Sequence, residues 1–189
     1  FWPSLPCDKA RKYTLRASLE AVCGKDKEIV RSSNHWDFWV YPESKEKAEE
    51  KDVYICTSLD SKAEEILSGG GKVLICADGN ISYGAGISQM FTPVFWNTSW
   101  FKMRPPHTTG LYIRNMHPSL RLFPTDSYSD LQWWSLVNRH QVMLLSDFPS
   151  DFQPIVQSID TWFLSRKIGM LFEARIGQGR LMVTTLPIA

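Results

Sequence analysis

The sequence lacks the features that mark several common classes of protein. No stretch approaches the roughly 20 apolar residues that a membrane span needs, so we expect no contact with a membrane interior. The formal net charge is only +1, because 21 basic residues stand against 20 acidic ones. Without an excess of positive charge, no field attracts nucleic acid or anionic lipid over the whole surface. We expect neither nucleic acid nor membrane as a partner.

The patterns of a metal site are also missing. The four cysteines form no Cys-x-x-Cys pair, and the four histidines are scattered singly. A zinc site needs several such ligands at close spacing, so we expect no metal. Cys56 and Cys76 lie inside apolar runs typical of strands, which favours buried, unreactive thiols. Cys7 and Cys23 could pair in an oxidising compartment, but their spacing does not decide this.

The sequence has no loop suited to a common cofactor. Gly84-Ala85-Gly86 is too short for a dinucleotide fingerprint. Residues 57–61 carry hydroxyl groups, but they lack glycine and include an acid where a phosphate would bind. Cys76 has no Gly-x-Cys-x-Gly surroundings that would make it a nucleophile on a tight turn. We expect no cofactor and no catalytic residue in this chain.

Residues 1–42 predict a β-hairpin. Residues 12–20 alternate polar and apolar side chains, and residues 35–41 are dense in aromatic and β-branched ones. Two strands alone are marginally stable in water. We therefore expect the hairpin to be a remnant of an immunoglobulin-like β-sandwich. The charged residues 43–51 predict a connector between this remnant and a second domain, residues 52–189.

Residues 52–189 predict an α/β accessory domain. A strand, a helix and a strand are expected at residues 52–57, 61–67 and 72–77. Such a β-α-β unit implies two parallel strands joined by a right-handed crossover. Residues 155–164 carry apolar side chains at helical spacing, and residues 169–186 predict a closing hairpin. The expected fold is an open, mostly parallel sheet flanked by helices.

Several segments resemble the C-terminal region of glycoside hydrolase family 2 proteins. They are residues 91–101, His117-Pro118-Ser119-Leu120, Phe123-Pro124-Thr125, Gln132-Trp133-Trp134, 169–173 and 177–181. Residues 34–42 are similar to the last strand of the immunoglobulin-like domain that precedes that region. The resemblance implies a β-galactosidase-like parent protein. It also implies that the α/β domain is flavodoxin-like or class I glutamine-amidotransferase-like.

The resemblance transfers no catalytic residue to this chain. The catalytic glutamates of the family lie on a TIM barrel, which typically needs about 250 residues, and no segment matches them. We expect a non-catalytic accessory domain of an enzyme of polysaccharide or oligosaccharide degradation, cut from a longer chain. Its expected partners are other domains of the parent, with a second subunit or a carbohydrate as further possibilities. By resemblance, the expected location is the periplasm, the cell surface or the medium.

Aromatic side chains are the main candidates for a binding role. Eight tryptophans are many for this length, and four of them flank loops: Trp96, Trp100, Trp133 and Trp134. Such rings pack a loop, form an interface with a partner or stack on sugar, and these three interpretations remain open. In the last, the aromatic loop 91–107 is a carbohydrate-binding module with Arg104 and His107 at its rim. Asp78 follows an apolar strand, where open α/β sheets bind ligands, and is a further candidate.

Overall fold

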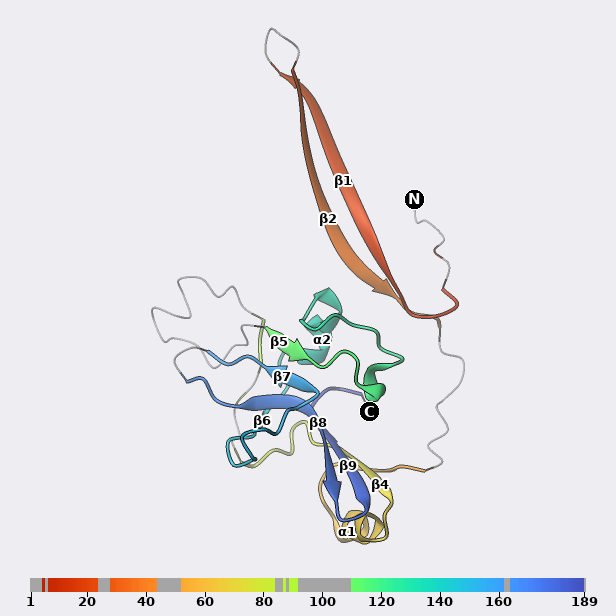
Figure 1. Cartoon of the computed structure of the whole chain (residues 1–189), viewed down its shortest axis with the longest axis vertical. Coiled ribbons are helices and arrows are strands. Elements are labelled where there is room, and N and C mark those ends of the chain that lie inside the picture. Colours follow the sequence, from red (N-terminus) through yellow and green to blue (C-terminus); the bar gives the residue numbers. More distant parts are fainter. Residues whose placement is uncertain are drawn as a thin grey trace.

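A computed structural model of the chain describes residues 5, 7–23, 28–43, 52–83, 87, 89–91, 110–161 and 164–188. These residues form a two-stranded sheet and a seven-stranded sheet. The two-stranded sheet is a long hairpin that projects from one end of the body, and the seven-stranded sheet forms the body itself (Figure 1). The first helix, α1, lies at the end of the body far from the hairpin (Figure 1).

The hairpin consists of β1 (Arg11–Cys23) and β2 (Glu28–Val40). The two strands pair antiparallel without interruption, from Arg11 opposite Val40 to Cys23 opposite Glu28. The alternation of polar and apolar residues predicts this hairpin, and the structure confirms it. Of the expected connector, residues 43–51, all but the first residue lie outside the described residues.

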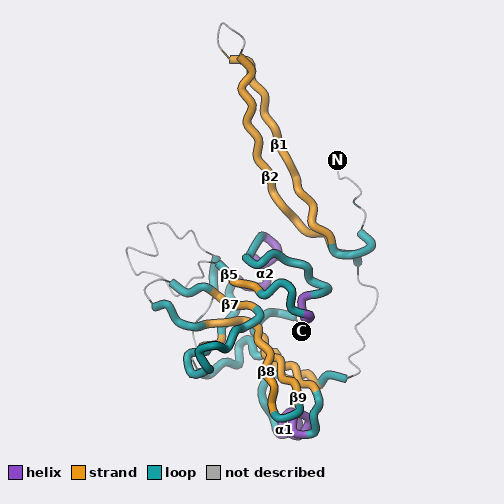
Figure 2. Tube along the Cα trace, viewed as in Figure 1, coloured by secondary structure: helices purple, strands orange, loops and turns teal. Residues whose placement is uncertain are grey.

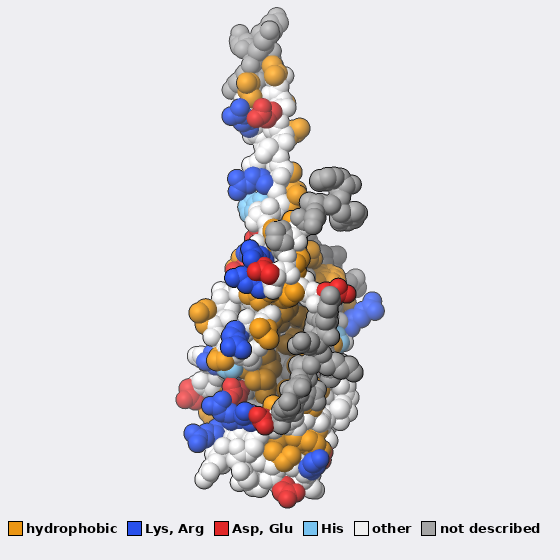
Figure 3. Space-filling view, turned by 90° about the vertical axis from the view of Figure 1, so that its right-hand side faces the viewer, with side chains coloured by type: hydrophobic (Ala, Val, Ile, Leu, Met, Phe, Trp, Pro, Cys, Tyr) orange, Lys and Arg blue, Asp and Glu red, His pale blue; other side chains and the backbone are white. Residues whose placement is uncertain are grey.

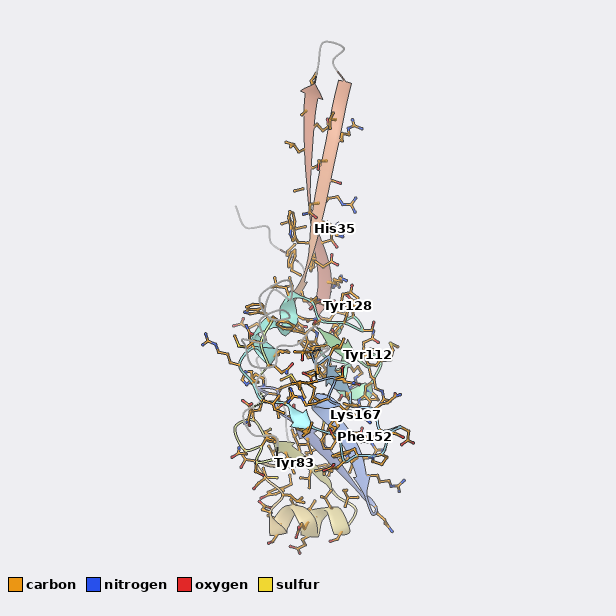
Figure 4. All side chains as sticks on the ribbon, turned by 90° about the vertical axis from the view of Figure 1, so that its left-hand side faces the viewer. His35, Tyr83, Tyr112, Tyr128, Phe152 and Lys167 are labelled. Atoms are coloured by element: carbon orange, nitrogen blue, oxygen red, sulfur yellow. The ribbon has the colours of Figure 1, made fainter. Side chains whose placement is uncertain are left out.

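The sheet of the body mixes parallel and antiparallel neighbours. Its order is β3 (Tyr54–Cys56), β4 (Lys72–Cys76), β9 (Gly179–Thr184), β8 (Ile168–Ile176), β7 (Val156–Ser158) and β5 (Leu111–Ile113), with β6 (Met143–Leu144) paired to β8. The pairs β3–β4 and β4–β9 are parallel. The other pairs, β8–β9, β7–β8, β5–β7 and β6–β8, are antiparallel. Tyr112 and Tyr128 form an isolated bridge beside β5, and Figure 4 shows them close together below the hairpin.

Helices are few and short in the described part of the chain (Figure 2). They are α1 (Ser61–Ser68), α2 (Trp134–Val137) and the 3-10 turns η1 (Pro118–Leu120) and η2 (Leu131–Trp133). Asp60 begins α1, because its carboxylate accepts a hydrogen bond of 2.7 Å from the backbone N–H of Ala63. None of these helices is long and apolar enough to cross a membrane.

The fold class predicted from the sequence is wrong. The structure is mostly β, with 40% strand and 12% helix. It is not a helix-flanked, mostly parallel sheet of the flavodoxin-like or glutamine-amidotransferase-like kind. The first β-α-β unit forms as predicted, but after β4 the sheet continues through hairpins and antiparallel neighbours. Local patterns predicted single elements, whereas the order of strands depends on long-range pairing.

The helix predicted at residues 155–164 is also wrong, because β7 occupies its first part. The apolar residues of this segment fit a helical spacing, but from Val156 to Asp160 the buried positions alternate with more exposed ones. Val156, Ser158 and Asp160 are buried, whereas Ile159 between them is 46% exposed. A period of two is that of a strand. The pattern was hidden because two of its buried members are polar.

Close packing of α1 on β9 leads to a first testable prediction. A Cβ atom added at Gly179 would lie 2.4 Å from the backbone oxygen of Leu67 and 2.8 Å from its Cα atom. Backbone atoms of a helix cannot move aside individually, so Gly179→Ala is expected to lower the free energy of unfolding by about 1–3 kcal/mol. Urea unfolding measures this loss, and amide hydrogen exchange should show faster opening of α1.

The nearby Gly177 provides the control, because nothing lies within 4 Å of its added Cβ atom. Gly177 has a φ of +57°, so Gly177→Ala strains only the turn between β8 and β9. Amide exchange within α1 is expected to stay unchanged in that variant. Equal exchange rates in α1 for wild type and Gly179→Ala would contradict the proposed clash.

Candidate functional site

The base of the hairpin is fixed to the body by charged and polar contacts. Lys12 Nζ lies 3.0 Å from Asp37 Oδ2 on β2 and 2.8 Å from Asp126 Oδ2 on the body. Hydrogen bonds to Asp126 and then to Asp37 raise the pKa of Lys12, which keeps this ammonium group charged. Trp39 Nε1 donates a hydrogen bond of 2.6 Å to Asp130 Oδ2. These contacts join both strands to the segment that precedes η2.

An aromatic ladder continues this attachment into the core. The ring of Tyr41 stacks on Phe123 with centroids 5.7 Å apart, and Phe123 meets Trp133 edge to face at 5.2 Å. Tyr41 Oη donates a hydrogen bond of 2.5 Å to Gln132 Oε1. Burial, with the nearby charge of Asp130, raises the pKa of Tyr41 to about 12, so its hydroxyl stays a donor. The hairpin is therefore held at a defined place on the body.

One face of the hairpin is apolar and largely exposed. Leu15 and Leu19 alternate with polar residues along β1 and are 59% and 69% exposed. Trp36 lies opposite Leu15 in the register and is 51% exposed, and Val30, at 48%, points to the same face. Figure 3 shows hydrophobic side chains exposed along the hairpin. A hairpin rarely presents several large apolar side chains on one face to water unless a partner covers them.

The opposite face of the hairpin is polar over most of its length, with the exposed apolar pair Val22 and Ile29 near the tip. Arg31 Nε lies 2.9 Å from Glu20 Oε1 across the two strands, and Thr14 Oγ1 donates a hydrogen bond of 2.7 Å to Asp37 Oδ1. In the described part of the chain, no further strand pairs with the outer edge of β1 or β2. The hairpin therefore combines an apolar face, a solvated face and two open edges.

A second candidate site surrounds His117 on the body. The backbone N–H of Ser119 donates to His117 Nδ1 over 3.3 Å, so this ring nitrogen accepts and carries no proton. The proton then lies on Nε2, which is 3.2 Å from Glu173 Oε2 on β8. His117 lines a polar pocket of about 440 Å³, together with three arginines and Glu173.

The site has the residue types of a hydrolytic triad, namely Ser119, His117 and Glu173. Their arrangement, however, is that of a helix N-cap, with His117 at the start of η1. Ser119 lies two residues after His117 in the turn that begins η1. Its Oγ atom, 2.9 Å from His117 Nδ1, shares that acceptor with its own backbone N–H. We interpret the contact as orienting the His117 ring toward Glu173, not as activating a nucleophile.

Asp78 lies in a cross-link between two loops. It follows β4, and its Oδ2 atom is 2.6 Å from His140 Nδ1. Its Oδ1 atom accepts a hydrogen bond of 2.9 Å from the backbone N–H of Gln141. Both carboxylate oxygens are therefore engaged within the protein. We interpret Asp78 as joining the end of β4 to the segment that leads into β6.

The two adjacent tryptophans differ in role. Trp133 is 1% exposed, and its Nε1 donates a hydrogen bond of 2.8 Å to Thr125 Oγ1. Trp134 is 50% exposed and stacks on Phe91 with centroids 5.7 Å apart. Trp133 thus packs the core beneath the hairpin base, whereas Trp134 lies at the surface. The candidates within the aromatic loop 91–107 lie outside the described residues; they are Trp96, Trp100, Arg104 and His107.

Neither metal binding nor thiol chemistry is supported by the described residues. No group of three or more His, Cys, Asp or Glu side chains there could hold a metal ion. Burial raises the pKa of Cys56 and of Cys76, which disfavours their reactive thiolate forms. Cys7 is a free cysteine in the structure.

A comparison with known protein families shows which family the body belongs to. A family model matches residues 54–189, from the first residue of β3 to the end of the chain. The chain belongs to the DUF8487 family. This family is described as a domain of unknown function, and its match covers the seven-stranded sheet but not the hairpin. No curated protein matches the chain.

The DUF8487 region contains the attachment site of the hairpin and the pocket around His117, and the sequence indicated them only in part. Phe123-Pro124-Thr125 and Gln132-Trp133-Trp134 stood out as motifs, and the structure shows that they hold the base of the hairpin. Sequence reasoning missed Trp39 and Tyr41 as anchoring residues and missed the arginines around His117. The alternation in β1 was a usable signal for the apolar face. No local signal linked His117 to Glu173, which lies far along the chain.

Proposed function

We propose that the chain is a non-catalytic accessory module of a larger, β-galactosidase-like glycoside hydrolase. Its hairpin is the contact to another β-sheet of that protein. The observation that carries the proposal is the exposed apolar face of β1 and β2, fixed in direction by the contacts at the hairpin base. The sequence resemblance to glycoside hydrolase family 2 supplies the identity of the larger protein.

The geometry favours an apolar sheet as the partner. Side chains on one face of a two-stranded sheet need a second layer about 10 Å away to exclude water. No described strand pairs with either edge of the hairpin, so further strands can extend it by backbone hydrogen bonds. The charged opposite face, with Arg31 and Glu20 paired, suits the outer side of such a sandwich. The facing layer is thus expected to be a sheet with alternating apolar residues.

Amide hydrogen exchange of β1 and β2 tests the contact. We expect these amides to exchange much more slowly in the full-length gene product than in the chain of residues 1–189. Leu19→Lys is expected to remove this protection. Burying a large apolar side chain contributes about 1.5–3 kcal/mol, so the effect corresponds to about tenfold or more in exchange rate.

Ser18→Lys is the matched control, since it places the same charge on the adjacent, polar side of β1. Protection in the full-length product should survive this change. Equal exchange of the hairpin in both proteins would refute the contact. If the chain by itself forms dimers in sedimentation velocity that Leu19→Lys dissolves, a second copy is the partner and the interdomain proposal fails.

A hydrolysis assay tests the enzymatic context separately. The chain and the full-length gene product are compared on a panel of aryl glycosides. We expect turnover by the full-length product alone. Turnover by residues 1–189 would overturn the accessory role, and inactivity of both would remove the link to a glycoside hydrolase.

A further inference from the structure

Three basic side chains lie in one row across the body sheet. In the register, Lys72 of β4 is beside Arg180 of β9, and Arg180 is directly opposite Arg175 of β8. Like charges in directly opposite positions destabilise a sheet. Arg180 Nη1 forms a long ion pair of 3.9 Å with Glu173 Oε1 in the pocket, and the Arg180 side chain is 72% exposed. One carboxylate is therefore shared among three cations, which leaves an excess of positive charge on this surface that an anionic ligand could balance.

The basic row lies on the face of the sheet that α1 does not cover. Val73 and Ile75 of β4 are buried in the cluster that contains the α1 residues Ala63 and Leu67. Successive residues of a strand point to opposite faces, so Lys72 and the half-buried Leu74 project from the other face.

Two adjoining hollows follow this row. The polar one, of about 440 Å³, is lined by Arg114, Arg175 and Arg180 with His117 and Glu173. The second, of about 410 Å³, shares His117, Glu173 and Arg180 with it and is mainly apolar. Its other lining residues include Leu74, Pro118 and Met182. Together they form a surface that is basic at one end and apolar at the other.

We propose that this surface binds a hydroxylated acid of sugar size, with its acidic group against Arg175 and Arg180. Guanidinium groups bind carboxylate and related oxyanions through paired hydrogen bonds. The Glu173 carboxylate accepts hydrogen bonds from hydroxyl groups and would repel a ligand that is anionic throughout. The apolar side chains of the second hollow can pack against C–H groups on one face of the ligand. A molecule that combines one acidic group, several hydroxyls and an apolar face satisfies all three parts.

Binding to the purified chain tests the site independently of the hairpin and of any enzyme activity. Galacturonate, galactose 6-sulfate, galactose and inorganic sulfate are titrated and followed by NMR. We expect the signals of Arg175, Arg180 and His117 to shift with either acidic sugar. The relative affinities of the two sugars then show whether the site prefers a carboxylate or a sulfate group. Galactose and inorganic sulfate are expected to bind at least about tenfold more weakly, since each satisfies only part of the surface.

The variant Arg175→Gln separates binding from folding. It removes a repulsive neighbour of Arg180, so its melting temperature is expected to equal or exceed that of wild type. Its affinity for the acidic sugar is expected to fall about threefold to fivefold, in the range of one partly solvated ion pair. Arg16→Gln, the same change on the hairpin, should leave affinity unchanged. Equal affinity for acidic and neutral sugars, for sulfate alone, or for wild type and Arg175→Gln would overturn the proposal.

Discussion

Replacing Trp133 with alanine is expected to lower the free energy of unfolding by about 3–5 kcal/mol, the range for large-to-small changes of buried aromatic residues. Trp133 is 1% exposed and belongs to the largest core cluster. Its removal leaves a cavity and also leaves Thr125 Oγ1 without its indole donor. Such a loss is a large fraction of the stability of an ordinary domain. Urea unfolding followed by circular dichroism measures it.

The loss should extend to the hairpin, because Trp133 supports Phe123, and Phe123 stacks on Tyr41. Amide exchange near Tyr41 is therefore expected to accelerate more than exchange in α1.

Trp134 provides a matched control from the next position in the chain. It is 50% exposed, so Trp134→Ala is expected to lower the free energy of unfolding by only about 1 kcal/mol. Trp133→Phe keeps an aromatic ring but removes the hydrogen bond to Thr125, and a loss intermediate between the two alanine variants is expected. Equal losses for Trp133→Ala and Trp134→Ala would contradict the assignment of Trp133 to the core.

Removing the charge of Asp160 is the second change with a large expected effect. Its side chain is 1% exposed, and Arg166 Nε and backbone N–H donate to Asp160 Oδ2 at 2.8 Å and 2.9 Å. Burial raises the pKa of Asp160, but the hydrogen bonds from Arg166 and from the backbone of Thr161, together with the charge of Arg166, outweigh it and lower the pKa overall. Asp160→Asn leaves Arg166 without its carboxylate and is expected to lower the free energy of unfolding by about 3–5 kcal/mol at pH 7.

The effect depends on pH in a defined direction. A carboxylate with a lower pKa in the folded state stabilises the protein above its unfolded pKa, here 3.8. That contribution is lost as the pH falls through the still lower folded pKa. The difference in unfolding free energy between wild type and Asp160→Asn should therefore be complete at pH 7 and shrink below pH 3.8.

Asp151→Asn, at an exposed turn, is the control and should change stability little at either pH. A difference between wild type and Asp160→Asn that stays constant down to acid unfolding would contradict the ion pair as its cause.

The elements that local patterns define were predictable from the sequence. The helix at Ser61–Ser68 and the closing hairpin of β8 and β9 lie where the residues indicated them. The segment after Pro154 was misassigned because its buried positions include Ser158 and Asp160. The buried carboxylate of Asp160 is stabilised by its ion pair with Arg166, and the sequence pattern does not reveal that partner.

The candidate sites also differ in whether a local sequence pattern reveals them. The apolar face of the hairpin follows from alternation in β1, because side chains of a strand point to alternate faces whatever surrounds them. The basic row of Lys72, Arg180 and Arg175 does not follow from any local pattern. Its members are far apart in the chain and become neighbours only through the order and register of β4, β9 and β8.

The sequence by itself determined the hairpin, the first β-α-β unit and the absence of a strong overall charge. Each of these depends on neighbouring residues or on composition alone. Tertiary structure decided that the body is a mixed sheet with few helices, that Tyr41 and Trp39 hold the hairpin in place, and that His117 meets Glu173. These features depend on which strands pair and in which register. Pairing is set by burial summed over the whole chain, which no short segment encodes.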